Sequence, residues 1–172
     1  MRVVNLFAGP GAGKSTTAAG LFHLMKLDGM SVELVTEYAK EMTWEKRHNI
    51  LTDQLYILAK QHRRVLRLRN EVEYVVTDSP FLVGILYRNQ HYSETLDRLV
   101  IELWNQYENV NFFLERVKAY VAVGRNQSEE EARRIDATTK ELLSRLQVPY
   151  ESVAGDAQAA SRIFARVKGL AL

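Results

Sequence analysis

Short apolar runs alternate along the chain with segments in which apolar residues recur at helical spacing. The apolar runs predict strands, and the segments between them have the pattern of amphipathic helices. Such alternation is typical of an α/β protein whose sheet is mainly parallel and is covered by helices. The predicted strands span residues 2–7, 31–36, 73–77, 110–114 and 150–153.

Helical patterns fill the intervals between these strands. The clearest covers residues 52–69, where Leu55, Leu58 and Val65 belong to one apolar face. Residues 39–50 indicate a short polar helix or a lid segment, and we interpret its Trp44 as a core anchor in preference to the wall of a binding pocket. The other helices are predicted at residues 17–27, 93–107, 128–146 and 157–168.

Composition limits the classes of protein that fit this pattern. The 172 residues are 47% hydrophobic and 26% charged, which is ordinary for a soluble protein with a single domain over residues 1–172. The chain has no cysteine, which excludes disulfides and thiolate metal sites and agrees with the cytoplasmic location that we expect. No apolar run is long enough to span a membrane, and because the first predicted strand comes so early we expect no signal peptide. A net charge of +2 is too small to indicate nucleic-acid binding by itself.

Residues 8–16, AGPGAGKST, connect the first predicted strand to the first predicted helix. They match the phosphate-loop pattern G-x-x-x-x-G-K-[S/T], with Ala8 in place of its first glycine. Glycines let backbone N–H groups point inward at a phosphate, beside the positive end of a helix. We expect Lys14 to reach the β- and γ-phosphates of ATP, and the Ser15 hydroxyl to ligate Mg²⁺. The expected nucleotide-binding residues are Gly9, Gly11, Ala12, Gly13, Lys14, Ser15 and Thr16.

Acidic residues follow the second and third predicted strands. Ligands of open α/β sheets bind outside the carboxyl ends of the strands, so we expect Glu37 and Asp78 at the same edge as the phosphate loop. Glu37 is either the base that accepts a proton from an attacking hydroxyl or a solvated residue that opens a helix. Asp78 is expected to orient the metal ion, and Asp78 or Ser79 can also cap the next helix.

A basic connection follows the fourth predicted strand and contains Arg116, Lys118 and Arg125. Ser128 and Glu131 have the spacing of a capping box, so a helix is expected to begin there. Phosphoryl transfer spreads negative charge over the transferred group, which arginines on a mobile lid can stabilise. We therefore predict a lid at about residues 116–136 with Arg116 and Arg125 as its catalytic arginines, although either residue taken alone could be a surface charge.

The basic face of residues 52–69 has two interpretations. A cluster of like charges on a helix is commonly a solvated face. Alternatively, Arg63 or Arg64, together with Gln54 or Gln61, contacts an acceptor that is anionic or carries a nucleobase. Tyr38, which directly follows Glu37, is a further candidate for the acceptor site.

Taken in order, the motifs AGPGAGKST, TEYAKE, DQ…QHRR, VTDSP and R…GR…EEE resemble those of the P-loop nucleoside and nucleotide kinase group. The chain is especially similar to small phage-type AAA-like ATP-binding proteins and to the kinase domain of ribosylnicotinamide kinases. The resemblance covers nearly the whole chain, although only the phosphate loop is individually specific. It implies a P-loop NTPase fold with a five-stranded parallel sheet in the order 2-3-1-4-5, helices on both faces, an arginine-bearing lid, and use of ATP and Mg²⁺.

The same resemblance matches Glu37 to the base of deoxynucleoside-kinase-like enzymes, Asp78 to the acidic residue after the third strand, and Arg116 and Arg125 to lid arginines. The chain departs from those enzymes at residues 78–80, Asp-Ser-Pro, where they carry an acidic residue followed by Arg-Ser. The expected function is an ATP-dependent kinase that acts on a nucleoside, a nucleotide or a related small molecule. Two alternatives stay open: a kinase acting on DNA or RNA, as in related phage kinases, and a nucleotide-dependent switch that moves a partner.

Overall fold

The computed structural model describes residues 1–117, 119–121 and 127–170. Its strands pair in parallel and form one five-stranded sheet in the order β2-β3-β1-β4-β5. The strands are β1 (Arg2–Phe7), β2 (Val32–Val35), β3 (Tyr74–Thr77), β4 (Glu108–Glu115) and β5 (Glu151–Ala154). The α/β class and the strand order expected from the sequence are therefore confirmed.

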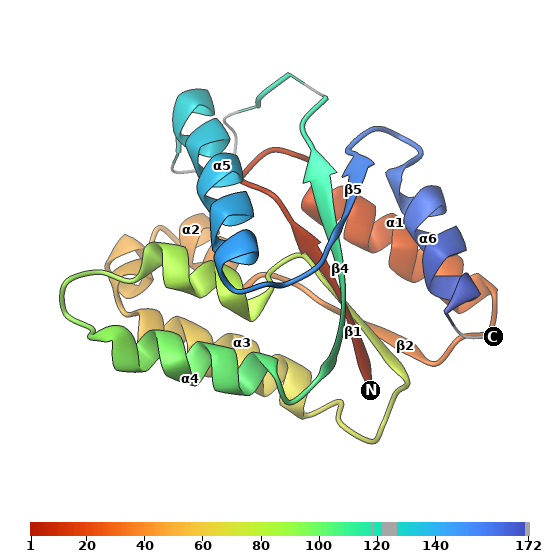
Figure 1. The fold of residues 1–172 in the computed structure, drawn as a ribbon, viewed down its shortest axis with the longest axis horizontal. Coiled ribbons are helices and arrows are strands. Elements are labelled where there is room, and N and C mark those ends of the chain that lie inside the picture. Colours follow the sequence, from red (N-terminus) through yellow and green to blue (C-terminus); the bar gives the residue numbers. More distant parts are fainter. Residues whose placement is uncertain (118, 122–126, 171–172) are drawn as a thin grey trace.

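Helices cover both faces of this sheet. Figure 1 shows α1 and α6 on one side, with α3, α4 and α5 on the other. The α-helices are α1 (Lys14–Leu27), α2 (Tyr38–Trp44), α3 (Gln54–Leu66), α4 (Glu94–Trp104), α5 (Glu129–Arg145) and α6 (Ala159–Gly169). Two short 3-10 helices, η1 (His48–Thr52) and η2 (Phe81–Tyr87), precede α3 and follow β3.

Strand β1 divides its side chains between two apolar layers because successive residues of a strand point to opposite faces. Val4 and Leu6 belong to the layer that contains residues of α1 and α6. Val3 and Phe7 belong to the layer that contains residues of α3, α4 and α5. Both faces of a parallel sheet are usually covered by helices. The buried residues of β1 accordingly pack into apolar layers on both faces of this sheet.

Capping side chains set where two of the helices begin. The Asp53 carboxylate accepts the backbone N–H of Tyr56 at 2.9 Å and so caps α3, which starts at Gln54. Ser128 and Glu131 form the expected capping box at the start of α5. The prediction for Trp44 was wrong: this residue ends α2 and is 59% exposed, so it does not anchor the core.

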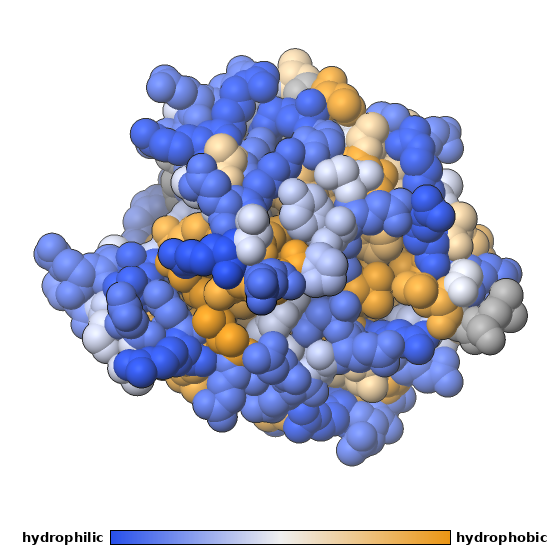
Figure 2. Space-filling model, viewed as in Figure 1, coloured by the Kyte–Doolittle hydropathy of each residue, from blue (hydrophilic) through white to orange (hydrophobic). Residues whose placement is uncertain are grey.

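The described surface is mainly polar. Figure 2 shows a face on which hydrophilic residues predominate and apolar residues lie in separate areas. Within residues 1–117, 119–121 and 127–170, no helix combines the length and apolar character needed to cross a membrane. Leu27, at the end of α1, is 74% exposed, whereas Leu21 of the same helix is fully buried.

Leu21→Ala should lower the free energy of unfolding by about 2–5 kcal/mol, because it removes buried methyl groups and leaves a cavity between α1 and the sheet. Urea unfolding followed by circular dichroism measures the change. Leu27→Ala is the matched control and should shift stability by about 0.5 kcal/mol or less. Equal losses in both variants would contradict the layer assignment.

Candidate active site

The phosphate loop joins β1 to α1 and has the backbone geometry of an anion site. Gly11 and Gly13 have φ angles of +81° and +101°, which favour glycine. Gly13 is the N-cap of α1, and no side chain caps this helix. The first turn of α1 also carries no acidic residue. Backbone N–H groups at this end are therefore available to a phosphate.

Lys14 lies over the loop that precedes it. Its ammonium donates to the carbonyl oxygens of Ala8 and Gly9 at 2.7 and 3.1 Å. Burial lowers the pKa of Lys14, while the charges of three carboxylates act in the opposite direction. These carboxylates belong to Glu37, Asp78 and Asp136. The structure thus brings Glu37 and Asp78, from the ends of β2 and β3, within electrostatic reach of Lys14.

Glu37 occupies a poorly solvated position at the N-cap of α2. Burial raises the pKa of its carboxyl, and the charges of Lys14 and Lys40 partly offset this rise. Burial, with a contribution from Glu37, also raises the pKa of the Tyr87 phenol to about 12, although 39% of Tyr87 is exposed. Tyr87 therefore stands beside the predicted base as a neutral phenol, a neighbour that the sequence analysis did not assign to the site.

Asp78 and Ser15, the two predicted metal ligands, differ in their surroundings. Asp78 is 2% exposed, and its Oδ1 has no hydrogen-bond partner within the part of the chain that the structure describes. Ser15 Oγ accepts a hydrogen bond of 3.2 Å from Lys40 Nζ. Lys40, which sequence reasoning missed, thus places an ammonium at a predicted Mg²⁺ ligand.

Asp78 and Ser15 suit a metal ion that takes most of its ligands from bound phosphates and water. Among the described residues, no group of three or more His, Asp or Glu side chains is arranged to hold a metal ion. Mg²⁺ commonly binds one or two protein oxygens, and phosphates and waters supply the others. An unpartnered carboxylate oxygen on Asp78 and the Ser15 hydroxyl are suitable for such a site.

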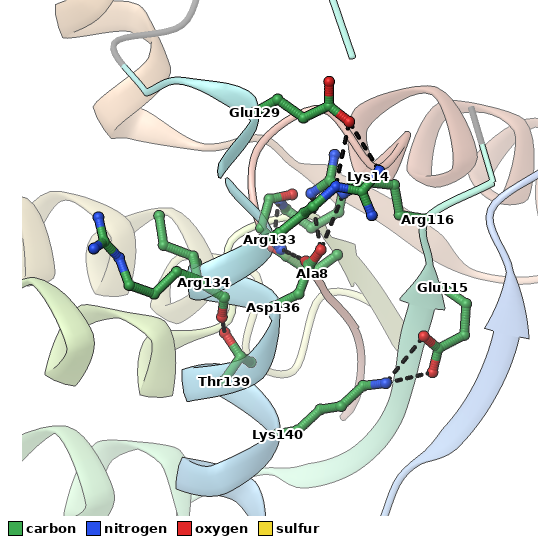
Figure 3. Close-up of polar contacts among 12 residues, drawn as sticks. Ala8, Lys14, Glu115, Arg116, Glu129, Arg133, Arg134, Asp136, Thr139 and Lys140 are labelled. Carbon is green, nitrogen blue, oxygen red and sulfur yellow. Dashed lines mark hydrogen bonds and ion pairs between the residues drawn. The ribbon is translucent and has the colours of Figure 1, made fainter. Parts of the chain in front are cut away.

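Arg116 directly follows β4, and its side chain is only 4% exposed. Its Nε donates to Asp136 of α5 at 3.0 Å. Figure 3 shows these two side chains meeting beside Ala8 and Lys14. Arg125 and Lys118, the other basic residues of the predicted lid, lie outside the described residues.

The four residues expected to bind the acceptor have different surroundings. Gln54 lines a small pocket that is partly open to solvent. Tyr38 is buried, and its hydroxyl donates to that of Tyr56 at 3.2 Å. Arg64 donates to Glu41 through both terminal nitrogens, at 2.8 and 2.5 Å, whereas Arg63 is exposed.

The pocket that contains Gln54 lies between α3, α4 and the segment after β3. Ser79 lines it, directly after Asp78, and so does Gln61. The side-chain oxygen of Gln61 accepts the Tyr38 backbone N–H at 3.0 Å, next to Glu37. Two lining residues therefore connect the pocket to Glu37 and Asp78. Its remaining lining residues are Ile57, Leu58, Pro80, Phe81, Gly84, Leu96 and Val100.

A family model described as an AAA domain matches residues 3–160. The chain belongs to this AAA domain family. No curated protein matches the chain. Among solved structures, the deoxyadenosine kinase from M. mycoides with bound dATP is similar over 100% of both chains, with 16% identity and a TM-score of 0.59. The AAA domain thus has the fold of the P-loop nucleoside and nucleotide kinases, as the resemblance implied.

The raised pKa of Glu37 predicts a pH-dependent effect of Glu37→Gln on the stability of this AAA domain. A carboxyl whose pKa is higher in the folded than in the unfolded state contributes most stability below its unfolded pKa. That contribution is lost as pH rises through the folded value. The glutamine variant, which is always neutral, should therefore be more stable than the wild type at neutral pH.

Thermal unfolding measured between about pH 3 and pH 7 would detect this difference, which should disappear near the acid end of the range. Glu71→Gln, at an exposed position, controls for the removal of one surface carboxylate. A glutamine variant less stable than the wild type at pH 7 would show that the carboxylate of Glu37 is needed in its charged form for folding.

Proposed function

We propose that the chain is an ATP-dependent kinase that transfers the γ-phosphate to a hydroxyl or phosphate of a nucleoside, a nucleotide or a related small molecule. The observation that carries this proposal is the convergence of charges on Lys14. The carboxylates of Glu37, Asp78 and Asp136, and the guanidinium of Arg116, all act on its ammonium. These groups supply the parts of a phosphotransferase around one phosphate loop.

The phosphate loop would bind the triphosphate through its backbone. The uncapped N–H groups of α1 face the anion, and Lys14 exchanges its bonds with Ala8 and Gly9 for phosphate oxygens. Arg116 adds a second positive charge at the rim of the loop. Buried donors that are already in place stabilise negative charge as it develops, with little reorganisation. Arg125 is still only predicted to be a second arginine that stabilises the transferred phosphate.

Glu37 is the proposed base. A carboxyl whose pKa is raised by burial is better matched to proton transfer near neutral pH than one at its ordinary value. It would accept the proton of the acceptor hydroxyl as that oxygen attacks the γ-phosphorus of ATP and ADP departs. If the acceptor is a phosphate, no such proton is removed, and Glu37 would instead orient the acceptor.

Ser15 and Asp78 would hold Mg²⁺ together with phosphate oxygens and water. When bound, the ion neutralises charge on the β- and γ-phosphates. The buried Oδ1 of Asp78 is free to serve as a ligand or to orient a ligand water. Lys40 donates to Ser15 Oγ, so its ammonium would have to move away from this oxygen for Mg²⁺ to bind there.

The acceptor pocket favours a small molecule. The pocket is lined mainly by apolar side chains, which suits a flat ring such as a nucleobase. The amides of Gln54 and Gln61 bond to the backbone of Leu51, Thr36 and Tyr38 and so hold the wall of the pocket. The arginines of α3 do not form a continuous basic stripe for a nucleic-acid backbone, because Arg64 is paired with Glu41. Arg69, which follows this helix, donates to Gln106. These pairings support a small-molecule acceptor over a polymer.

Incubation with γ-labelled ATP, Mg²⁺ and a panel of nucleosides, nucleotides and DNA oligonucleotides tests the proposal. We expect label on a nucleoside or nucleotide. Formation of ADP with no labelled acceptor would contradict kinase activity and favour an ATPase or switch. Label on the oligonucleotides alone would show that the acceptor is a polymer.

Two substitutions should separate binding from chemistry. Lys14→Ala should weaken ATP binding and abolish measurable turnover, because it removes the cation that contacts the phosphates. Glu37→Gln should leave ATP affinity within about twofold and lower turnover by about 10²-fold or more. Calorimetric titration with ATP and a coupled assay for ADP measure the two effects. Normal turnover by the glutamine variant would exclude Glu37 as the base.

A further inference from the structure

The guanidinium of Arg116 is buried but uses few of its hydrogen-bond donors. Its Nε donates to Asp136, and its Nη2 lies 3.0 Å from the same carboxylate oxygen. Neither terminal nitrogen has a hydrogen-bond partner among the described residues. Buried donors are almost always satisfied, so unpartnered ones mark a place where a ligand can accept. A phosphate is the ligand that this fork-shaped cation recognises best.

One of these two nitrogens lies close to the phosphate loop. Arg116 Nη1 lies 3.3 Å from the position that a Cβ would occupy at Gly11. Tyr120 lies against the same glycine, with a ring atom 3.0 Å from that position. The guanidinium thus presents its Nε edge to α5 and at least one terminal nitrogen to the loop that would hold the triphosphate.

Asp136 binds the phosphate loop as well as the arginine. Its Oδ1 accepts the backbone N–H of Gly9 at 2.5 Å, while its Oδ2 accepts from Arg116. Helix α5 lies so close here that a Cβ at Gly9 would be 2.3 Å from the carbonyl oxygen of Ala132. One carboxylate therefore joins α5, the first part of the phosphate loop and the end of β4 (Figure 3).

We propose that Asp136 is a positioning residue, which holds the Arg116 guanidinium against the phosphate loop with its Nη1 directed at the phosphates of ATP. This inference rests on the proposed function and deepens it. The negative charge of Asp136 would by itself repel a triphosphate. Its contribution is therefore geometric: it engages the Nε side of the arginine and leaves the other donors to the ligand.

This arrangement differs from an arginine delivered by a moving lid. Arg116 has its partner within the protein, and the same partner is bonded to the loop. The distance between the arginine and the loop is therefore set by one side chain. Because ordering a long side chain is costly, an arginine already held in place binds its ligand more tightly than a free one.

A double-mutant cycle tests the inference. The variants are Asp136→Asn, Arg116→Met and the double variant, and the dissociation constants of Mg·ATP and AMP are measured by calorimetry. Asparagine keeps the shape of the side chain and an oxygen that can accept from Gly9, but it removes the charge that holds Arg116. Glu129→Gln is the matched control, because it breaks an exposed ion pair with Arg133 on the same helix.

We expect each single variant to weaken ATP binding by about 10-fold or more and AMP binding by less than about 2-fold, since one charge-assisted contact to the outer phosphates is lost. The double variant should bind ATP no more weakly than Arg116→Met alone, because Asp136 acts through the arginine. Glu129→Gln should match the wild type. AMP affinity also reports whether each variant is folded.

A second measurement does not depend on the stability of Asp136→Asn alone. Millimolar guanidinium should partly restore ATP affinity to Arg116→Ala, where Asp136 can hold the free ion. It should not restore affinity to Arg116→Ala combined with Asp136→Asn. Equal restoration in both variants would overturn the proposed role of Asp136.

The outcomes separate this inference from the proposed function. The positioning role would be overturned by additive losses in the cycle, or by equal losses of affinity for ATP and AMP. The kinase proposal would still stand in that case if the wild type binds ATP more tightly than AMP. A wild-type chain that binds ATP no more tightly than AMP would overturn both.

Discussion

The close fit around the phosphate loop is the constraint on which the rest of the structure depends. Helix α5 reaches Gly9 so closely that a Cβ there would lie 2.3 Å from Ala132 O. The Tyr120 ring approaches a Cβ position at Gly11 to 3.0 Å, and the φ of that glycine is +81°. Packing therefore requires glycine at position 9, and both packing and backbone conformation favour glycine at position 11. Because these glycines have no side chain, the loop could admit an anion, and Asp136 of α5 comes close enough to bond to Gly9.

That fit gathers charges of both signs at one edge of the sheet. The carboxylates would repel one another in a poorly solvated site if no cations stood among them. Lys14 and Arg116 lie within the group, and Lys40 joins it through Ser15 and its effect on Glu37. The ammonium of Lys14 bonds to its own loop, and Arg116 bonds to Asp136. The cations that would bind phosphate are thus held by the protein in the structure described.

Features of this fold that depend on local pattern could be predicted from the sequence. The alternation of apolar runs and helical spacing located the strands, and the Ser128–Glu131 spacing located the start of α5. The strand order followed from the family resemblance. The exposure of Trp44 could not be predicted, because it depends on which elements pack against the end of α2.

The candidate site could be predicted where its residues follow strands and not where they come from helices. The carboxyl ends of parallel strands share an edge, so Glu37 and Asp78 could be expected near the phosphate loop. Asp136 is 127 residues from Gly9 in sequence, and nothing local indicates that they bond.

The lengths of the outer strands have a consequence for how copies of the protein behave together. Strands β2 and β5 form the two edges of the sheet, and each has only four residues. An edge strand exposes unpaired backbone groups that can recruit a strand from another molecule, and short edges offer little template for such pairing. The longer strands β1 and β4 lie inside the sheet with a paired strand on each side, and β5 pairs with Phe112–Glu115 of β4. The fold thus keeps its longest runs of β-structure away from the places where aggregation would begin.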